Sequence, residues 1–255
     1  MSKPMPHQPV QQTLFRLRVR YGKRGRLAYL GHLEVMHTIE RIVRRAGLAY
    51  AVTQGFSPRM RAGFSSALPV GTSSTCEWYD LFLTRLVPAR EALARLQEAS
   101  PEELAPDLAA YIAVRAPALT AQITRVRYRA ELSGARGDVD LRDVESSLAA
   151  VVNRELIPYA RGKKDKVLDL GKLLVSTDAR EAGPGRIELD IDSRCDNEGA
   201  LRPEILIAAL DRELLSSREP IVSTGIQALE AFDRYAVERT AQLIEDDDGR
   251  LLEPL

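Results

Sequence analysis

Apolar and basic residues alternate near the start of the chain. The apolar positions are Phe15, Leu17, Val19 and Tyr21, and the basic positions between them are Arg16, Arg18 and Arg20. A period of two is typical of a strand with one buried and one solvated face. We therefore expect a strand over residues 14–20 that presents three arginines to solvent.

The spacing of the apolar residues becomes longer after a glycine-containing turn at residues 22–25. Apolar residues then recur at helical spacing, at Leu33, Met36, Ile39, Val43 and Ala46. Gly47 follows where a helix C-cap belongs, so the pattern predicts a helix over residues 33–46. The polar side of this helix carries His37, Arg41, Arg44 and Arg45.

The rest of the first half mixes strand and helix patterns. We expect strands at residues 48–53, 61–65, 78–83 and 123–132, and a helix at 89–99. The order strand, helix, strand, strand pair, helix, strand resembles that of a ferredoxin-like βαββαβ unit. Such a domain is therefore expected over residues 13–133.

A glycine-containing break at residues 134–137 precedes the second half of the chain. The patterns there predict a short helix at 144–152, strands at 156–159, 167–175 and 187–191, a helix opened by Pro203, and a last strand within 221–239. We expect a second, less regular ferredoxin-like domain over residues 134–243. The predicted fold class is α+β.

Composition places the chain among folded proteins of the cell interior. Apolar residues make up 45% and charged residues 28% of its 255 residues, which is ordinary for a globular protein. Residues 1–12 predict a disordered leader and not a secretory signal, and residues 244–255 predict an acidic tail. Cys76 and Cys195 are too few for a disulfide framework, and no run of about 18 apolar residues predicts a membrane span. We therefore expect a cytoplasmic protein.

Charge is balanced over the whole chain but not along it. Lysine plus arginine and aspartate plus glutamate number 36 each, yet only Glu34 and Glu40 are acidic between residues 14 and 62. Clustered arginines match phosphate geometry and gain from counterion release, so this region predicts an RNA-binding surface. The expected contacts are Arg16, Arg18, Arg20, Lys23, Arg24, Arg26, Arg41, Arg44, Arg59 and Arg61. A solvated charged face, or a docking surface for an acidic protein, explains the same residues.

His32 is the one candidate catalytic residue, because it lies close along the chain to Tyr29 and Ser57, whose side chains could take part in a reaction. It is expected to share a pocket rim with Tyr29 and with the loop residues Gln54, Gly55, Phe56 and Ser57, since all fall at the ends of adjacent elements. Tyr29 and Phe56 would be available to stack on bases. His32 would act as a general base if a partner oriented it, and would otherwise help to cap the helix start.

Motifs that hold metals or cofactors are missing from the sequence. It contains no metal-ligand spacing, no Walker loop, no Rossmann fingerprint and no CxxxCxxC triplet for a radical-SAM iron–sulfur cluster. We therefore expect this chain to hold neither a metal nor a cofactor.

Several blocks, in a fixed order, resemble one known family. They are RLAYLGHLEVM at 26–36, ER at 40–41, RRAGL at 44–48, QGFSPR at 54–59, ALPVG at 67–71, DLGKLL at 169–174 and LRPE at 201–204. Together they are similar to the radical-SAM-linked protein family, a bacterial domain of unknown function, over about residues 14–243. The chain has Gly31 where that family usually has serine, and Ser57 where it usually has asparagine.

The resemblance implies a partner and not a reaction. Members of the family often follow, or are fused to, a B12-binding-type radical-SAM protein, and their genes often lie near those for ribonuclease and ribosomal proteins. No established catalytic residue transfers to this chain. The resemblance and the basic region together favour an auxiliary RNA-binding protein that works with a radical-SAM enzyme, in RNA modification or ribosome-related metabolism.

Two alternatives stay open. The first is a metal-independent RNA endonuclease in which His32 is the general base on a 2′-hydroxyl. The second is a module that docks onto the radical-SAM partner without binding RNA.

Overall fold

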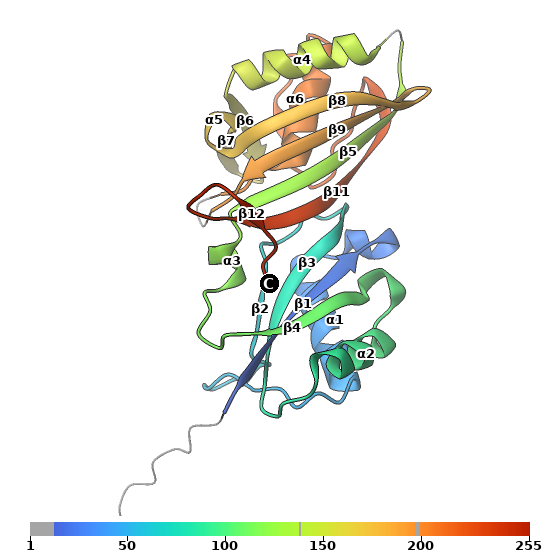
Figure 1. The fold of residues 1–255 in the computed structure, drawn as a ribbon. Coiled ribbons are helices and arrows are strands. Elements are labelled where there is room, and N and C mark those ends of the chain that lie inside the picture. Colours follow the sequence, from blue (N-terminus) through green and yellow to red (C-terminus); the bar gives the residue numbers. More distant parts are fainter. Residues whose placement is uncertain (1–12, 138, 197–198) are drawn as a thin grey trace, which may run out of the picture.

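The computed structural model describes residues 13–137, 139–196 and 199–255, and the leader expected at residues 1–12 lies outside this range. The described chain has the predicted α+β class (Figure 1). Its main feature is a nine-stranded sheet in which seven strands follow the order β4-β1-β3-β11-β5-β9-β8. Two short strands pair at its margins, β2 with β3 and β12 with β11.

The first half supplies one end of this sheet. Its elements are β1 (Phe15–Lys23), η1 (Gly25–Tyr29), α1 (His32–Arg45), β2 (Ala62–Phe64), β3 (Thr72–Leu83), α2 (Ala89–Ala99), η2 (Glu102–Leu104) and β4 (Pro106–Ile112). Strand β1 pairs antiparallel with both β3 and β4. The expected strand at residues 48–53 is reduced to isolated bridges at Tyr50 and Val52.

The second half supplies the other end. Its elements in the large sheet and against it are β5 (Arg125–Ala135), α4 (Leu141–Asn153), β8 (Leu174–Gly183), β9 (Arg186–Arg194), α6 (Pro203–Leu214) and β11 (Phe232–Glu245). A separate three-stranded sheet contains β6 (Leu156–Arg161), β7 (Lys164–Asp169) and β10 (Ile221–Val222). The remaining short elements are α3 (Leu119–Gln122), α5 (Leu170–Leu173) and β12 (Leu251–Leu252).

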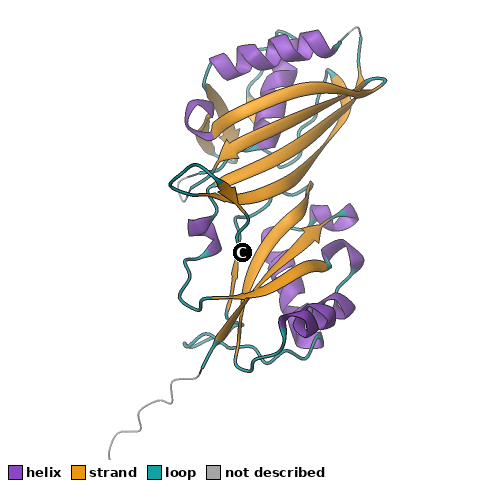
Figure 2. Ribbon diagram, viewed as in Figure 1, coloured by secondary structure: helices purple, strands orange, loops and turns teal. Residues whose placement is uncertain are grey.

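The two halves share one sheet, so the expectation of two ferredoxin-like units is not confirmed in the form predicted. The joint is a short parallel pairing of β3 with β11, in which Thr72 lies opposite Val237 and Ser74 opposite Arg239. Strands of the two halves meet over this short stretch and diverge beyond it (Figure 2). The segment expected as an acidic tail also belongs to the fold, because β12 pairs with the end of β11.

Helix α1 forms where the apolar spacing predicts it, shifted by one residue at each end. Val35, Ile39, Ile42 and Val43 are buried against the apolar side of β1. Leu17 and Val19 in that strand are fully buried, as the alternation predicted. The burial of these side chains supplies the hydrophobic stabilisation of the first half. A separate, larger apolar core lies under α4 and α6 in the second half.

The face of the second half that carries no helix is a layer of paired charges. Arg127 and Arg129 on β5 lie opposite Asp192 and Asp190 on β9, as the strand register requires. Arg127 Nε is 2.9 Å from Asp192 Oδ2, and Arg129 Nε is 2.9 Å from Glu188 Oε1. Cross-strand pairs of opposite charge stabilise an exposed sheet face modestly, and here they also cancel its net charge.

Candidate functional site

The arginines of β1 do not face solvent, so the sequence prediction for this side of the strand is wrong. Arg18 is 1% exposed and Arg16 is 6% exposed. Asp80 on the neighbouring β3 accepts two hydrogen bonds from Arg18, at 2.7 Å from Nε and 2.9 Å from Nη2. It also accepts two from Arg16, at 3.1 Å from Nε and 2.6 Å from Nη2. One carboxylate thus bridges two guanidinium groups.

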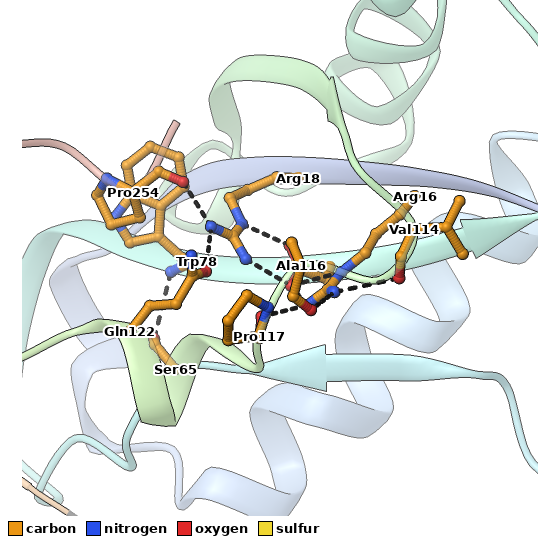
Figure 3. Close-up of polar contacts among 10 residues, drawn as sticks. Arg16, Arg18, Ser65, Trp78, Val114, Ala116, Pro117, Gln122 and Pro254 are labelled. Atoms are coloured by element: carbon orange, nitrogen blue, oxygen red, sulfur yellow. Dashed lines mark hydrogen bonds and ion pairs between the residues drawn. The ribbon is translucent and has the colours of Figure 1, made fainter. Parts of the chain in front are cut away.

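Main-chain carbonyls and the side chain of Gln122 accept further hydrogen bonds from these arginines (Figure 3). Arg18 Nη1 donates to the Pro254 carbonyl at 2.5 Å and to Gln122 Oε1 at 2.9 Å. Arg16 donates to the carbonyls of Ala116 and Pro117. Two segments that are distant in sequence therefore cover this face of the sheet, and a phosphate has no access to Arg16 or Arg18.

Arg20 is intermediate between these buried arginines and the surface. Its side chain is 25% exposed and pairs with Asp107 at 2.9 Å and with Glu253 at 2.8 Å. The guanidinium also lies 5.7 Å from the ring centroid of Trp78. With two carboxylates beside it, Arg20 contributes no net positive charge to the surface.

The other predicted RNA contacts, Lys23 apart, are on the surface. Seven arginines between residues 24 and 61 are exposed, namely Arg24, Arg26, Arg41, Arg44, Arg45, Arg59 and Arg61. Only Arg44 has an acidic partner among the described residues, Glu40 at 3.4 Å. Arg41 donates to the Thr38 hydroxyl, and Arg61 stacks 4.3 Å above the ring centroid of Phe82. The positive charge of the other six is therefore uncompensated by the fold.

The structure does not bring the predicted pocket together. His32 begins α1, and its ring makes an edge contact with Phe64 at 6.1 Å between centroids. The loop with Gln54, Gly55, Phe56 and Ser57 follows the far end of α1, whose 14 residues span about 20 Å. This loop is a tight hairpin in which Thr53 N donates to Arg59 O, and Phe56 is fully exposed at it. The pairing of residues 60–64 back towards His32 keeps the loop at the opposite end of the domain.

Tyr29 lies near the second half and not near the loop. Its exposed side chain borders a small pocket at the seam between the halves, together with Gly71, Ile226 and Tyr235. A larger groove of about 360 Å³ continues along the same seam. Arg161, Arg202, Ser223 and Thr224 line it, but Arg202 is already paired with Glu204 at 2.8 Å.

A buried polar cluster lies at the joint between β3 and β11. Glu77, Arg239 and Gln242 are each less than 5% exposed. Arg239 Nη1 lies 3.3 Å from Glu77 Oε1, and Gln242 Nε2 lies 3.2 Å from the same oxygen. Burial lowers the pKa of Arg239, but Glu77 and the stacked ring of Tyr128 outweigh it and the net pKa is raised. Arg239 therefore stays charged as a structural cation.

Lys23 lies at the edge of this cluster, at the end of β1. It is 2% exposed, and among the described residues its ammonium has no carboxylate within 4.0 Å and donates no hydrogen bond. Burial lowers the pKa of Lys23 to about 8, with Arg239 acting in the same direction and Glu77 opposing. Burial also lowers the pKa of His32, and the charge of Lys23 contributes to that shift. The charge of Lys23 thus disfavours protonation of His32, and His32 stays neutral at pH 7.

The buried acids and their partners could not be found from local patterns. Glu77 and Asp80 stand among the apolar and aromatic residues that fill the second part of β3, from Cys76 to Leu83, which is the one sequence signal that they needed buried partners. Arg239 and Gln242 lie 162 and 165 residues from Glu77, so only the strand pairing reveals them.

The remaining chemistry is limited. Among the described residues there is no cluster of three metal-ligating side chains, and none of the helices could cross a membrane. Both cysteines are free and buried, and burial raises the pKa of the Cys76 thiol to about 12. A thiol of this kind is a packing residue and not a nucleophile.

A family model covers residues 16–203 of this chain, which is most of its length. That family is described as an uncharacterized protein conserved in bacteria, DUF2344. The chain therefore belongs to this bacterial family. Nothing in that match bears on a radical-SAM partner. No curated protein matches the chain.

Solved structures of RNA–protein particles resemble the chain weakly. A Cbf5–Nop10–Gar1 complex aligns over 91% of this chain and 50% of the other, with 11% identity and a TM-score of 0.44. An H/ACA RNP bound to a substrate RNA containing 2′-deoxyuridine aligns over 89% and 47%, with 10% identity and a TM-score of 0.41. The chain spans about half the length of these proteins. Similarity at this level assigns no function.

The Asp80 bridge should be essential to stability. Asp80→Asn leaves two buried guanidinium groups without a counter-charge, and we expect it to lower the free energy of unfolding by about 3–5 kcal/mol. Asp107→Asn breaks an exposed pair on the same strand face and should cost about 0–1 kcal/mol. Urea denaturation followed by circular dichroism measures both. Equal losses for the two variants would show that the Asp80 pairs are not internal.

Lys23 should make stability depend on pH in a defined window. The unfolded chain keeps the Lys23 proton up to pH of about 10.4, whereas the folded chain releases it near pH 8. The unfolded state therefore binds more protons between these values, and stability rises with pH across that window. Lys23→Met should remove this rise. Across the window, the free energy of unfolding of the wild type should therefore increase by about 1–3 kcal/mol relative to that of Lys23→Met. Lys163→Met, at an exposed lysine, should retain it; parallel curves for wild type and Lys23→Met would contradict the assignment.

Proposed function

We propose that this protein binds RNA through the exposed arginines of its first half. The observation that carries the proposal is their lack of acidic partners: six of the seven exposed arginines between residues 24 and 61 have none among the described residues. Arg41 and Arg45 are one helical turn apart on α1 and project from its solvent side. Such uncompensated, adjacent guanidinium groups favour a polyanion, because neutralising phosphates releases counterions.

The second half offers an internal contrast. Its exposed sheet arginines, Arg127 and Arg129, each have a carboxylate at 2.9 Å. An arginine that already has an acidic partner must give it up before it can bind a phosphate, so this face is a poor RNA surface. The proposal therefore assigns the binding surface to α1, η1 and the segment around β2.

Binding fits the surroundings of His32 better than cleavage does. A general base needs a partner that orients its ring. His32 contacts the edge of Phe64, and the described residues offer no hydrogen bond to its imidazole. The endonuclease alternative has no orienting group to support it.

The proposal includes a radical-SAM enzyme as the partner that acts on the bound RNA. Its support is the resemblance of the sequence blocks given above. Purification of the tagged protein from cells should bring down such an enzyme. If ribonuclease releases the enzyme, RNA joins the two; if it does not, the contact is direct, as in the docking-module alternative. Failure to recover any such enzyme in either condition would reject the partner.

Substitution of α1 arginines should weaken RNA binding in a salt-dependent way. Each phosphate contact on a single strand contributes about 0.7 to the slope of log affinity against log salt. Arg41→Gln with Arg45→Gln should flatten the slope by about 1 and leave the fold intact, because both side chains are exposed. Fluorescence anisotropy with a labelled single-stranded RNA ending in a 5′-hydroxyl, across a salt series, measures the slope.

Arg127→Gln with Arg129→Gln is the matched control, since it removes the same net charge from paired arginines. It should leave the slope unchanged. Equal flattening in both double variants would mean that only the net charge matters. An unchanged slope in both would remove α1 from the RNA surface and favour the docking module.

A further inference from the structure

The groove at the seam has one wall from each half of the chain. Residues 67–70 form the first wall, and a backbone hydrogen bond of 3.0 Å from Gly71 N ties them to η1. The second wall contains Arg161, at the end of β6, and residues 223–225, which a backbone hydrogen bond of 2.8 Å holds beside β6. The groove has a volume of about 360 Å³ and is open to solvent. A ligand therefore reaches it without movement of the fold.

The β6–β7 hairpin, which carries Arg161, is strongly basic at its turn. Its cations there are Arg161, Lys163, Lys164 and Lys166. Asp165 is the one acid among residues 161–166, every residue of this segment is exposed, and none of the four cations has an acidic partner among the described residues. In the register of the hairpin, Arg161 lies directly opposite Lys164. Like charges in this position are destabilising, and a bound polyanion would remove their repulsion.

An exposed aromatic ring lies beside the same groove. Tyr29 is the last residue of η1, and its side chain is 60% exposed. It borders the small pocket that adjoins the groove, and the two share Val70 and Gly225 in their walls. One continuous depression therefore has an accessible ring on the side of the first half and the unpaired guanidinium of Arg161 on the side of the second.

We propose that the seam groove binds a single-stranded segment of RNA. Arg161 and Lys164 hold the sugar–phosphate backbone, and Tyr29 stacks on a base. A cationic groove with an accessible aromatic ring suits a single strand, because every base has a π-face and the phosphates are contacted whatever the sequence. A duplex cannot use Tyr29 in this way, since its bases are already stacked on one another. The inference rests on the function proposed above and adds to the α1 surface a contact that distinguishes single strands from duplexes.

The salt dependence of RNA binding by the full chain tests the contacts of the hairpin. Arg161→Gln with Lys164→Gln should flatten the slope of log affinity against log salt by about 1, since each phosphate contact on a single strand contributes about 0.7. The fold should be retained, because both side chains are exposed and the substitutions remove their repulsion. Arg127→Gln with Arg129→Gln loses the same charge from paired arginines and should leave the slope unchanged.

Stacking on Tyr29 is tested by a loss of affinity that salt does not alter. Tyr29→Ala should weaken binding of single-stranded RNA about tenfold at every salt concentration and leave the slope unchanged, because a stacked base releases no counterions. Tyr29→Phe keeps the ring and should bind as the wild type does. Neither substitution should change the affinity for a duplex of the same sequence.

A second measurement uses the wild type alone, in case Tyr29→Ala disturbs the seam. Single-stranded RNA that carries a photoreactive thiouridine is irradiated in complex with the protein, and mass spectrometry of the digested protein locates the crosslinks. The single strand should crosslink to Tyr29, whereas the same RNA in a duplex should not.

The outcomes separate this inference from the function on which it rests. If Arg41→Gln with Arg45→Gln flattens the slope while the hairpin and Tyr29 variants bind as the wild type does, the groove is overturned and the α1 surface stands. If the hairpin and Tyr29 variants lose affinity and the α1 variant does not, RNA binds at the groove and the α1 surface is rejected. A flattened slope in the hairpin variant with no effect of Tyr29→Ala and no crosslink to Tyr29 overturns the single-strand site. A wild type that binds no RNA overturns both proposals.

Discussion

The parallel pairing of β3 with β11 is the contact on which the arrangement of the two halves depends. It spans only three residue pairs, from Thr72 opposite Val237 to Ser74 opposite Arg239. Because paired strands hold their side chains in register, Glu77 and Arg239 meet in one buried space although 162 residues separate them. A one-residue slip would separate this charge pair and leave both ions buried alone, which is strongly destabilising. The same joint leaves Lys23 beside the pair but outside it.

Local patterns predicted the elements of the first half well, because each depends on its own side chains. The apolar spacing located α1 to within one residue, and the alternation in β1 identified Leu17 and Val19 as core. The same alternation could assign Arg16 and Arg18 to the opposite face, but it could not say what lies against that face. The covering groups come from residues 114–122 and from Pro254, about 100 and more than 200 residues away. A period of two in the sequence shows which residues share a face of a strand. It does not show which distant segments of the chain cover that face.

The candidate site was predictable only in part, for the same reason. His32 was expected at a helix start and is found there. The loop with Phe56 was expected beside it, because both lie at element ends, but the hairpin folds back at the other end of α1. Lys23 was predicted as a surface contact from its charge alone. The end of β1 that carries Lys23 pairs with Ser74 on β3 and lies against η2, and no feature of the local sequence encodes those neighbours.

The net charge of the chain is zero, but its basic side chains have three different kinds of surroundings. Arg16 and Arg18 share the single carboxylate of Asp80 inside the fold, and the sheet arginines of the second half are paired with acids on the adjacent strand. Of the arginines on α1, Arg44 is paired with Glu40, whereas Arg41 and Arg45 have no acidic partner among the described residues. Exposed charges of this kind cost little stability because salt screens them over about 8 Å, yet they still draw a polyanion to the surface. A buried ammonium differs, since solvent screens it little. The charge of Lys23 therefore lowers folding stability below pH of about 8, where the folded chain keeps its proton, and the cost disappears as that proton is released.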